Sequence, residues 1–138
     1  MTRRRHIHSL RSETGQTAVE FALVAPVLIL LLLGVVQMGI AFNNYLAVTD
    51  AARAGARKAI VARLSGLTSA DVTQSVRDAA SDLDQSKLGV TVADATDPTW
   101  SRAGSDITVT VTYPYSISLL GLVVSSGNLT STMTDRLE

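Results

Sequence analysis

The longest pattern in the chain is an uninterrupted apolar run near its N-terminus. No formally charged side chain occurs between Glu20 and Asp50, and residues 27–33 read VLILLLL. A helix rises about 1.5 Å per residue, so a helix over Phe21 to Phe42 is long enough for the hydrocarbon core of a bilayer, which is about 30 Å thick. The pattern predicts a transmembrane segment at residues 21–42.

The helical pattern continues beyond this run. Residues 47–62 are rich in good helix formers and contain no proline, so a single helix is predicted over residues 16–64. Its outer half carries small residues at helical spacing on one face, where another element could pack closely: Ala52, Gly55, Ala56 and Ala59. Gly34 and Gly39, inside the apolar run, are further helix-packing candidates, although their spacing is not that of the GxxxG dimer motif.

A second, shorter helix is predicted after the long one. Ser65-Gly66 ends the first helix, because glycine is favoured just past a helix C-terminus. Thr68 and Asp71 resemble a capping box with Asp in place of Glu. The helix that they begin is predicted over residues 69–84, with apolar residues on one face at Val72, Val76 and Leu83.

Strand patterns follow. Val90 and Val92 alternate with polar residues, and the clearest alternation covers residues 106–113, where Pro114 is expected to end the strand. A last strand is predicted over residues 129–137, and Trp100 is expected to cover the edge of the core. Residues 117–124 are apolar but too few to span a membrane. Two interpretations stay open for them: burial in the head, or a contact surface for another subunit.

These elements predict an α+β fold with three parts. A leader (1–15) precedes the long helix (16–64), which has a transmembrane half and an exposed half, and a small head (65–138) contains the second helix and a roughly three-stranded antiparallel sheet. A head of this size is marginal without disulfides or metals, and its sheet needs a second layer. We expect the exposed half of the long helix to supply that layer.

The distribution of charge indicates an orientation. The whole chain has twelve basic and twelve acidic residues, but the leader carries four arginines against one glutamate. From Ser65 onward there are four basic and nine acidic residues, a net charge of −5. The positive-inside rule therefore predicts a cytoplasmic N-terminus, a single span of the cytoplasmic (inner) membrane and an extracytoplasmic head. Such an acidic head is a poor partner for nucleic acid.

The sequence contains no recognisable catalytic or cofactor-binding pattern. It has no cysteine, which excludes disulfides and thiolate sites, and no P-loop, nucleophile elbow or HExxH motif. His6 and His8 form an HxH pair, for which a solvated basic tail is the favoured interpretation over a metal site. We therefore expect a non-enzymatic protein without a cofactor or a metal.

The boundary of the apolar run carries a specific motif. A secretory signal peptide has a shorter apolar region than this one. Residues 15–26 read GQTAVEFALVAP and precede the leucine run. This arrangement resembles the processing site of type IV prepilins and, more narrowly, the TadE-like family of pseudopilins from Tad (Flp) pilus systems. The resemblance continues through the small residues of 51–57, AARAGAR.

The resemblance implies cleavage between Gly15 and Gln16 by a prepilin peptidase and a pilin-like lollipop fold. It also implies a minor pilin or pseudopilin that takes part in pilus biogenesis, and hence in bacterial surface adhesion. The implied partners are other pilin or pseudopilin subunits, the peptidase, the lipid bilayer and, indirectly, a pilus assembly platform with its ATPase.

Glu20 has a physical role beside this resemblance. Cleavage would create an α-amino group at Gln16, with a pKa of roughly 8, and in staggered parallel helices this amine could meet Glu20 of a neighbour. Such pairing would lower the cost of placing a carboxylate in the bilayer and would set axial register. Phe21 and Pro26 belong to the same assembly segment, and a proline is tolerated in a membrane helix. The alternative is that Glu20 simply faces headgroups or water.

Two rival functions remain. One is an uncleaved single-pass membrane protein whose extracytoplasmic head binds a ligand. The other is a pseudopilin of a type II secretion machine, which shares the cleavage logic but not the fuller AVEFALVAP match.

Overall fold

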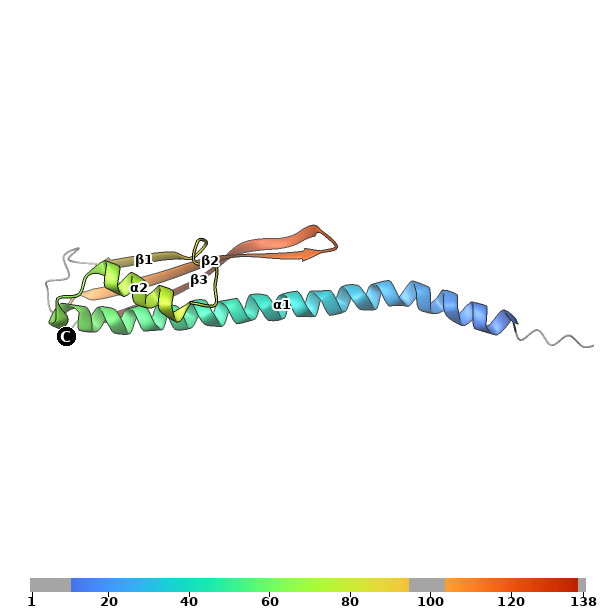
Figure 1. Ribbon diagram of the computed structural model, residues 1–138, viewed down its shortest axis with the longest axis horizontal. Helices are drawn as coiled ribbons and strands as arrows, with labels where there is room; N and C mark the ends of the chain where they lie inside the picture. The colour runs from blue at the N-terminus through green and yellow to red at the C-terminus, as the bar shows by residue number, and fades with distance from the viewer. Residues whose placement is uncertain (1–10, 95–103, 137–138) are drawn as a thin grey trace, which may run out of the picture. The chain divides into compact units, whose positions relative to one another are not determined.

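A computed structural model describes residues 11–94 and 104–136 of the chain (Figure 1). These residues form two helices and three strands: α1 (Arg11–Ser65), α2 (Ser69–Ala79), β1 (Gly89–Asp94), β2 (Asp106–Leu119) and β3 (Leu122–Arg136). The α+β class, with a long N-terminal helix, a second helix and a three-stranded antiparallel sheet, is therefore confirmed. The expectations for the histidine pair in the leader and for Trp100 fall outside the described residues.

Helix α1 ends where the sequence predicts. Ser65 is its last residue, and Gly66 follows with a φ of +67°, a left-handed conformation that glycine adopts without a steric penalty. Its first described residue, Arg11, lies ahead of the predicted start at Gln16. The chain divides into two compact units, Met1–Val36 and Gln37–Glu138. The second unit contains the later part of α1, all of α2 and the sheet.

Helix α2 begins as predicted but ends earlier. The backbone N–H of Thr68 donates to the Asp71 carboxylate at 2.7 Å, which completes the predicted capping box. The helix ends at Ala79 instead of near Asp84, so that part of the prediction is wrong. Leu83 is nevertheless buried, as its spacing indicates, because a turn after Ala80 brings it back to the core.

The three strands form one antiparallel sheet in the order β1-β2-β3. Val90 lies opposite Val111, and Val109 lies opposite Met133. The predicted alternation along β2 is confirmed: Ile107, Val109 and Val111 are fully buried, whereas the threonines between them are half-buried.

Strand β2 does not end at Pro114, contrary to the prediction. It continues to Leu119, and β3 correspondingly begins at Leu122 instead of Leu129. The physical reason is that the pairing with β1 stops at Thr112, so that beyond this point β2 pairs only with β3. A proline is tolerated on such an edge because no neighbouring strand needs its missing N–H.

The core of the second unit lies between α1, α2 and the sheet. The predicted second layer is confirmed, since the small residues of α1 pack in one cluster with apolar residues of α2 and β2. The fully buried members of this cluster are Val48, Ala51, Ala52, Ala59, Val72, Val76, Ala80, Ile107, Val109 and Val111.

Candidate functional site

The predicted processing motif lies on an exposed stretch of α1. Gly15, Gln16 and Glu20 are all exposed and helical. The Gln16 side-chain amide (Nε2) donates to Oε1 of Glu20 at 3.2 Å, as residues four apart on one helix face do. A side chain added at Gly15 would meet nothing within 4 Å. The Gly15–Gln16 peptide bond is thus open to solvent, although it lies within a helix.

The segment after the motif is apolar on all sides. Phe21 is 69% exposed, and the leucines around it on α1 are exposed to a similar degree. Pro26 lies inside the helix without ending it. Within the described part of the chain, α1 is the one helix that is both long and apolar enough to cross a membrane, and its most apolar stretch is not buried within the protein. A single-pass membrane anchor fits these properties.

The helix-packing candidates fall into two groups. Gly34 and Gly39 have open space around them, with nothing within 4 Å of an added Cβ. In contrast, Ala52, Gly55, Ala56 and Ala59 are all buried. A Cβ at Gly55 would come within 2.5 Å of the Val76 Cγ2 and 3.0 Å of the Val109 Cγ1.

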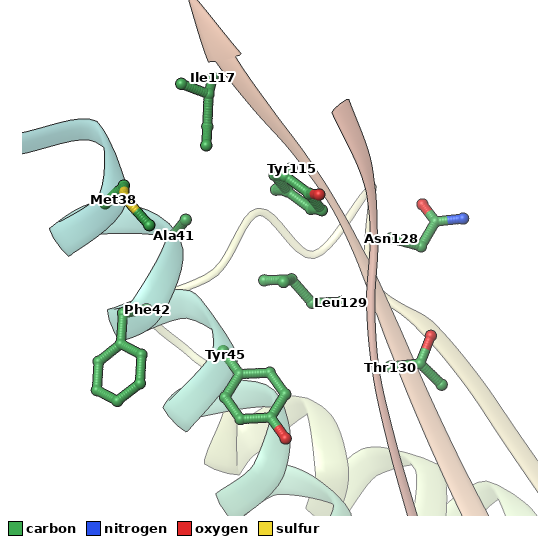
Figure 2. Close-up of a pocket in the computed structure, with 9 residues that line it drawn as sticks. All are labelled: Met38, Ala41, Phe42, Tyr45, Tyr115, Ile117, Asn128, Leu129 and Thr130. Atoms are coloured by element: carbon green, nitrogen blue, oxygen red, sulfur yellow. The ribbon is translucent and has the colours of Figure 1, made fainter. Parts of the chain in front are cut away.

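A groove in the second unit was not predicted from the sequence. It has a volume of about 590 Å³ and lies between α1 and the β2–β3 hairpin (Figure 2). Figure 2 shows Leu129 pointing from β3 toward α1, while Asn128 and Thr130 on the same strand point away. The lining is mostly apolar and aromatic: Met38, Ala41, Phe42, Tyr45, Tyr115, Ile117, Asn128, Leu129 and Thr130. No local sequence pattern signals it, because its lining residues lie far apart along the chain.

The perturbed ionisable groups lie away from this groove lining and stabilise local turns. Hydrogen bonds from the backbone N–H and the hydroxyl of Thr68 hold the pKa of Asp71 below its usual value. The Ser86 hydroxyl and then the Lys87 ammonium lower the pKa of Asp84, whose carboxylate in turn raises the pKa of Lys87. The Asp84–Lys87 ion pair measures 3.1 Å. These groups cap a helix and fix a turn, and their geometry suggests no acid–base chemistry.

Over residues 11–94 and 104–136, no three histidine, cysteine, aspartate or glutamate side chains gather where a metal could bind. The site therefore consists of two features, an exposed motif at the start of an apolar helix and an apolar groove in the second unit.

The comparisons with known proteins bear on the first of these features. The model of the family described as TadE-like protein matches residues 15–57, the stretch from the motif to the small residues of α1. The resemblance to the TadE-like family is thereby confirmed over these residues. The searches of curated proteins and of solved structures found no match.

Proposed function

On the premise that residues 15–57 form a TadE-like segment, we propose that the chain is a minor pilin or pseudopilin of a Tad pilus system. It is made as a prepilin, inserts in the inner membrane with its head extracytoplasmic, and is cleaved after Gly15. It has no enzymatic activity of its own and contributes to pilus assembly and surface adhesion through contacts with other pilus subunits. The observation that carries this proposal is the family match across the GQTAVEF motif and the apolar helix that follows.

The exposure of Gly15 supports the processing step. A peptidase must draw the chain out of its helical conformation to reach the scissile bond, and glycine is a poor helix former, so the turn around Gly15 opens at low cost. Because Gly15 contacts nothing, Gly15→Ala leaves the fold intact and tests recognition alone. We expect mass spectrometry of the membrane-extracted wild-type protein to show an N-terminus at Gln16, and Gly15→Ala to retain the leader. A wild-type protein that retains residues 1–15 would contradict the processing step.

Glu20 is the proposed register residue. In the single chain its carboxylate accepts a hydrogen bond from Gln16, the residue that becomes N-terminal after cleavage. We propose that in the assembled pilus the Glu20 carboxylate pairs with the new amine of a neighbouring subunit. Glu20→Gln should leave cleavage intact but impair pilus formation, measured by electron microscopy of sheared surface fibres. Glu13→Gln is the matched control, because Glu13 is removed with the leader and the change should have no effect on pili.

The main rival is an uncleaved membrane protein with a binding head, and the apolar groove of the second unit is the observation in its favour. It predicts that the Gly15→Ala protein behaves like the wild type and that deletion of the protein causes no pilus defect. A type II secretion pseudopilin would be cleaved in the same way, but its deletion would impair protein secretion instead of piliation.

A further inference from the structure

The end of the β2–β3 hairpin exposes an apolar surface that none of the described residues covers. Leu120 and Leu122 are 77% and 74% exposed, and Val123 and Val124 are both 64% exposed. No formally charged residue occurs from Ile107 to Thr134, so the hairpin presents no charge near this surface. Contiguous apolar patches on monomers mark sites of interaction with a protein or a membrane. Of residues 117–124, the first three are half-buried and the last five are exposed, so burial in the head does not account for the apolar turn.

The hairpin is attached to α1 at the last residues of the predicted transmembrane segment. The Gln37 side-chain amide donates to the backbone carbonyl of Ser118 at 2.8 Å. One residue earlier, Ile117 lines the same groove as Met38 and Phe42. Residues 37–42 close the apolar run of the sequence, so the hairpin end lies beside a segment that itself belongs to the apolar span.

The path of β2 along α1 agrees with this placement. Val109 lies against Gly55, and Ser118 lies against Gln37. From Gln37 to Gly55, α1 covers about 27 Å at about 1.5 Å per residue. From Val109 to Ser118, β2 covers about 30 Å at about 3.3 Å per residue, so the two stretches match in length. Within the second unit, strand β2 therefore runs antiparallel to α1, from Gly55 back to Gln37.

The tyrosines lie between the apolar end and most of the charged residues of the second unit, and Lys87 lies beside Tyr113 and Tyr115. All three tyrosines of the chain lie at this level: Tyr45 on α1, and Tyr113 and Tyr115 on β2. On both elements the order is apolar residues, then tyrosine, then charge, with Asp50 following on α1 and Asp106 lying at the far end of β2. Tyrosine is enriched where membrane proteins cross the headgroup region. An interface with a second protein copy gives no reason for this order.

The turn has an exposed leucine at a position where another residue type would be less strained. Leu120 and Gly121 form a two-residue connection with φ values of +51° and +83°. Hairpins prefer Asn-Gly here, because a leucine at positive φ is sterically strained. Leu120 is nevertheless the most exposed large apolar residue in the described chain. Strained backbone positions of this kind cluster at functional sites.

We propose that the β2–β3 turn, residues 119–124, is a second membrane contact that inserts among lipid acyl chains at the interface next to α1. The insertion is shallow, on the order of 5–10 Å, as for other interfacial elements. It does not go deeper, because the free edges of a two-stranded hairpin would leave backbone groups without hydrogen bonds in the hydrocarbon. The proposal rests on the membrane anchorage of α1 but not on a role in pili.

The absence of cysteine allows a direct test in the full-length chain. Leu122→Cys carries an environment-sensitive fluorophore, and the protein is reconstituted in vesicles of phosphatidylcholine and phosphatidylglycerol. Thr132→Cys on β3 is the control on the charged side, about 33 Å farther along the strand at about 3.3 Å per residue. Ile29→Cys, in the centre of the apolar run, reports anchorage itself.

We expect the Leu122 probe to show blue-shifted emission and quenching by lipids with a shallow nitroxide label, and the Thr132 probe to be quenched by aqueous iodide. Iodide quenching at Leu122 with lipid quenching at Ile29 would overturn this inference and leave the anchor intact. Iodide quenching at both positions would overturn the inference and the membrane anchorage together. Shielding at Leu122 that disappears when the protein is diluted in lipid would identify a second copy as the occupant and overturn the lipid contact.

A variant of the turn separates lipid contact from folding. Leu120→Asn removes the exposed leucine and introduces a residue that the turn prefers. We expect it to raise the unfolding temperature of the second unit and to reduce lipid quenching at the Leu122 probe. Unchanged quenching in a folded Leu120→Asn protein would contradict the proposal.

Discussion

At the scale of single residues, Gly55 has the closest packing on α1. It is buried between Val76 of α2 and Val109 of β2, both of which are fully buried. The absence of a side chain at Gly55 therefore determines how closely the helix approaches the sheet and α2.

Gly55→Val should destabilise the second unit. Overpacking a core destabilises a protein by about 1–3 kcal/mol. The higher helix propensity of valine relative to glycine stabilises the helix by only about 0.3–0.5 kcal/mol. The loss is measured as a lower midpoint of thermal unfolding in detergent. Gly39→Val is the control, since a Cβ there meets nothing, and an equal midpoint for Gly55→Val and the wild type would contradict the packing argument.

In contrast to Gly55→Val, a substitution at Leu120 should stabilise the second unit. Its positive φ costs an L-residue with a bulky side chain about 1 kcal/mol, and asparagine tolerates this conformation better. Leu120→Asn should therefore stabilise the second unit by up to about 1 kcal/mol in chemical denaturation. A loss of stability would show that the leucine packs against something in the isolated protein.

Asp71, at the start of α2, and Asp84, in the turn after it, make the free energy of unfolding depend on pH in the acidic range. The pKa values of Asp71 and Asp84 are lower in the folded protein than the ordinary 3.8, so the folded state binds protons less tightly than the unfolded state. Their stabilisation is present above pH 3.8 and is lost as the pH falls through the lower folded values. Lys87 has a raised pKa, so its contribution is lost only when the pH rises above 10.5.

The unfolding midpoint should thus be flat near neutral pH and should fall below about pH 4. Asp71→Asn should lower the midpoint at neutral pH and flatten its acid dependence. An unchanged acid slope in this variant would show that other carboxylates cause the dependence.

At the scale of elements, the end of α2 shows how side chains override a helical pattern. The spacing of Val72, Val76 and Leu83 is compatible with a longer helix, but the chain leaves the helix at Ala80. The Gln85 side-chain amide then donates to the carbonyls of Ala80 at 2.7 Å and Leu83 at 3.1 Å. These bonds satisfy backbone groups that a helix would otherwise pair.

Gln85→Ala should destabilise the second unit by about 1 kcal/mol, because it removes two hydrogen bonds to half-buried carbonyls. The cost is limited, since the buried Oε1 of Gln85 makes no hydrogen bond to the described residues and is lost as well. Chemical denaturation is the measurement. Gln74→Ala, which breaks one exposed bond to Asp78, should have nearly no effect, and equal losses in the two variants would contradict this role of Gln85.

Local sequence patterns predict some of these features and not others. Alternation at Ile107, Val109 and Val111 is a local pattern, and the strand and its buried face follow from it. The continuation past Pro114 depends on where β1 stops pairing, which is a tertiary fact. The processing motif is readable as residues 15–20, whereas the groove joins α1 to residues distant in sequence, Tyr115 and Leu129, and no local pattern contains it.

At the scale of the whole molecule, the core of the head includes residues of α1. Residues from Ser65 onward supply α2 and the sheet, but one layer of the core comes from α1, including Val48, Ala52 and Ala59. Small domains with a single thin core are marginally stable, and loss of one layer exposes the apolar face of the sheet.

A fragment of residues 65–138 should therefore be unfolded, whereas residues 43–138 should fold. The readout is the dispersion of amide signals in nuclear magnetic resonance spectra. A folded 65–138 fragment would show that α1 is dispensable for the head.

The order of the core layers along the chain also determines when the core can form. The buried face of α1 emerges first, but its partner β2 is the central strand and is held on its other side by β3, the last element described. In the proposed topology, the part of this face that packs on β2 stays uncovered until most of the chain has crossed the membrane, because this contact is distant in sequence. A chain terminated just before Asp106 should therefore be degraded rapidly by periplasmic proteases, and pulse-chase labelling would show a long half-life if the face were protected earlier.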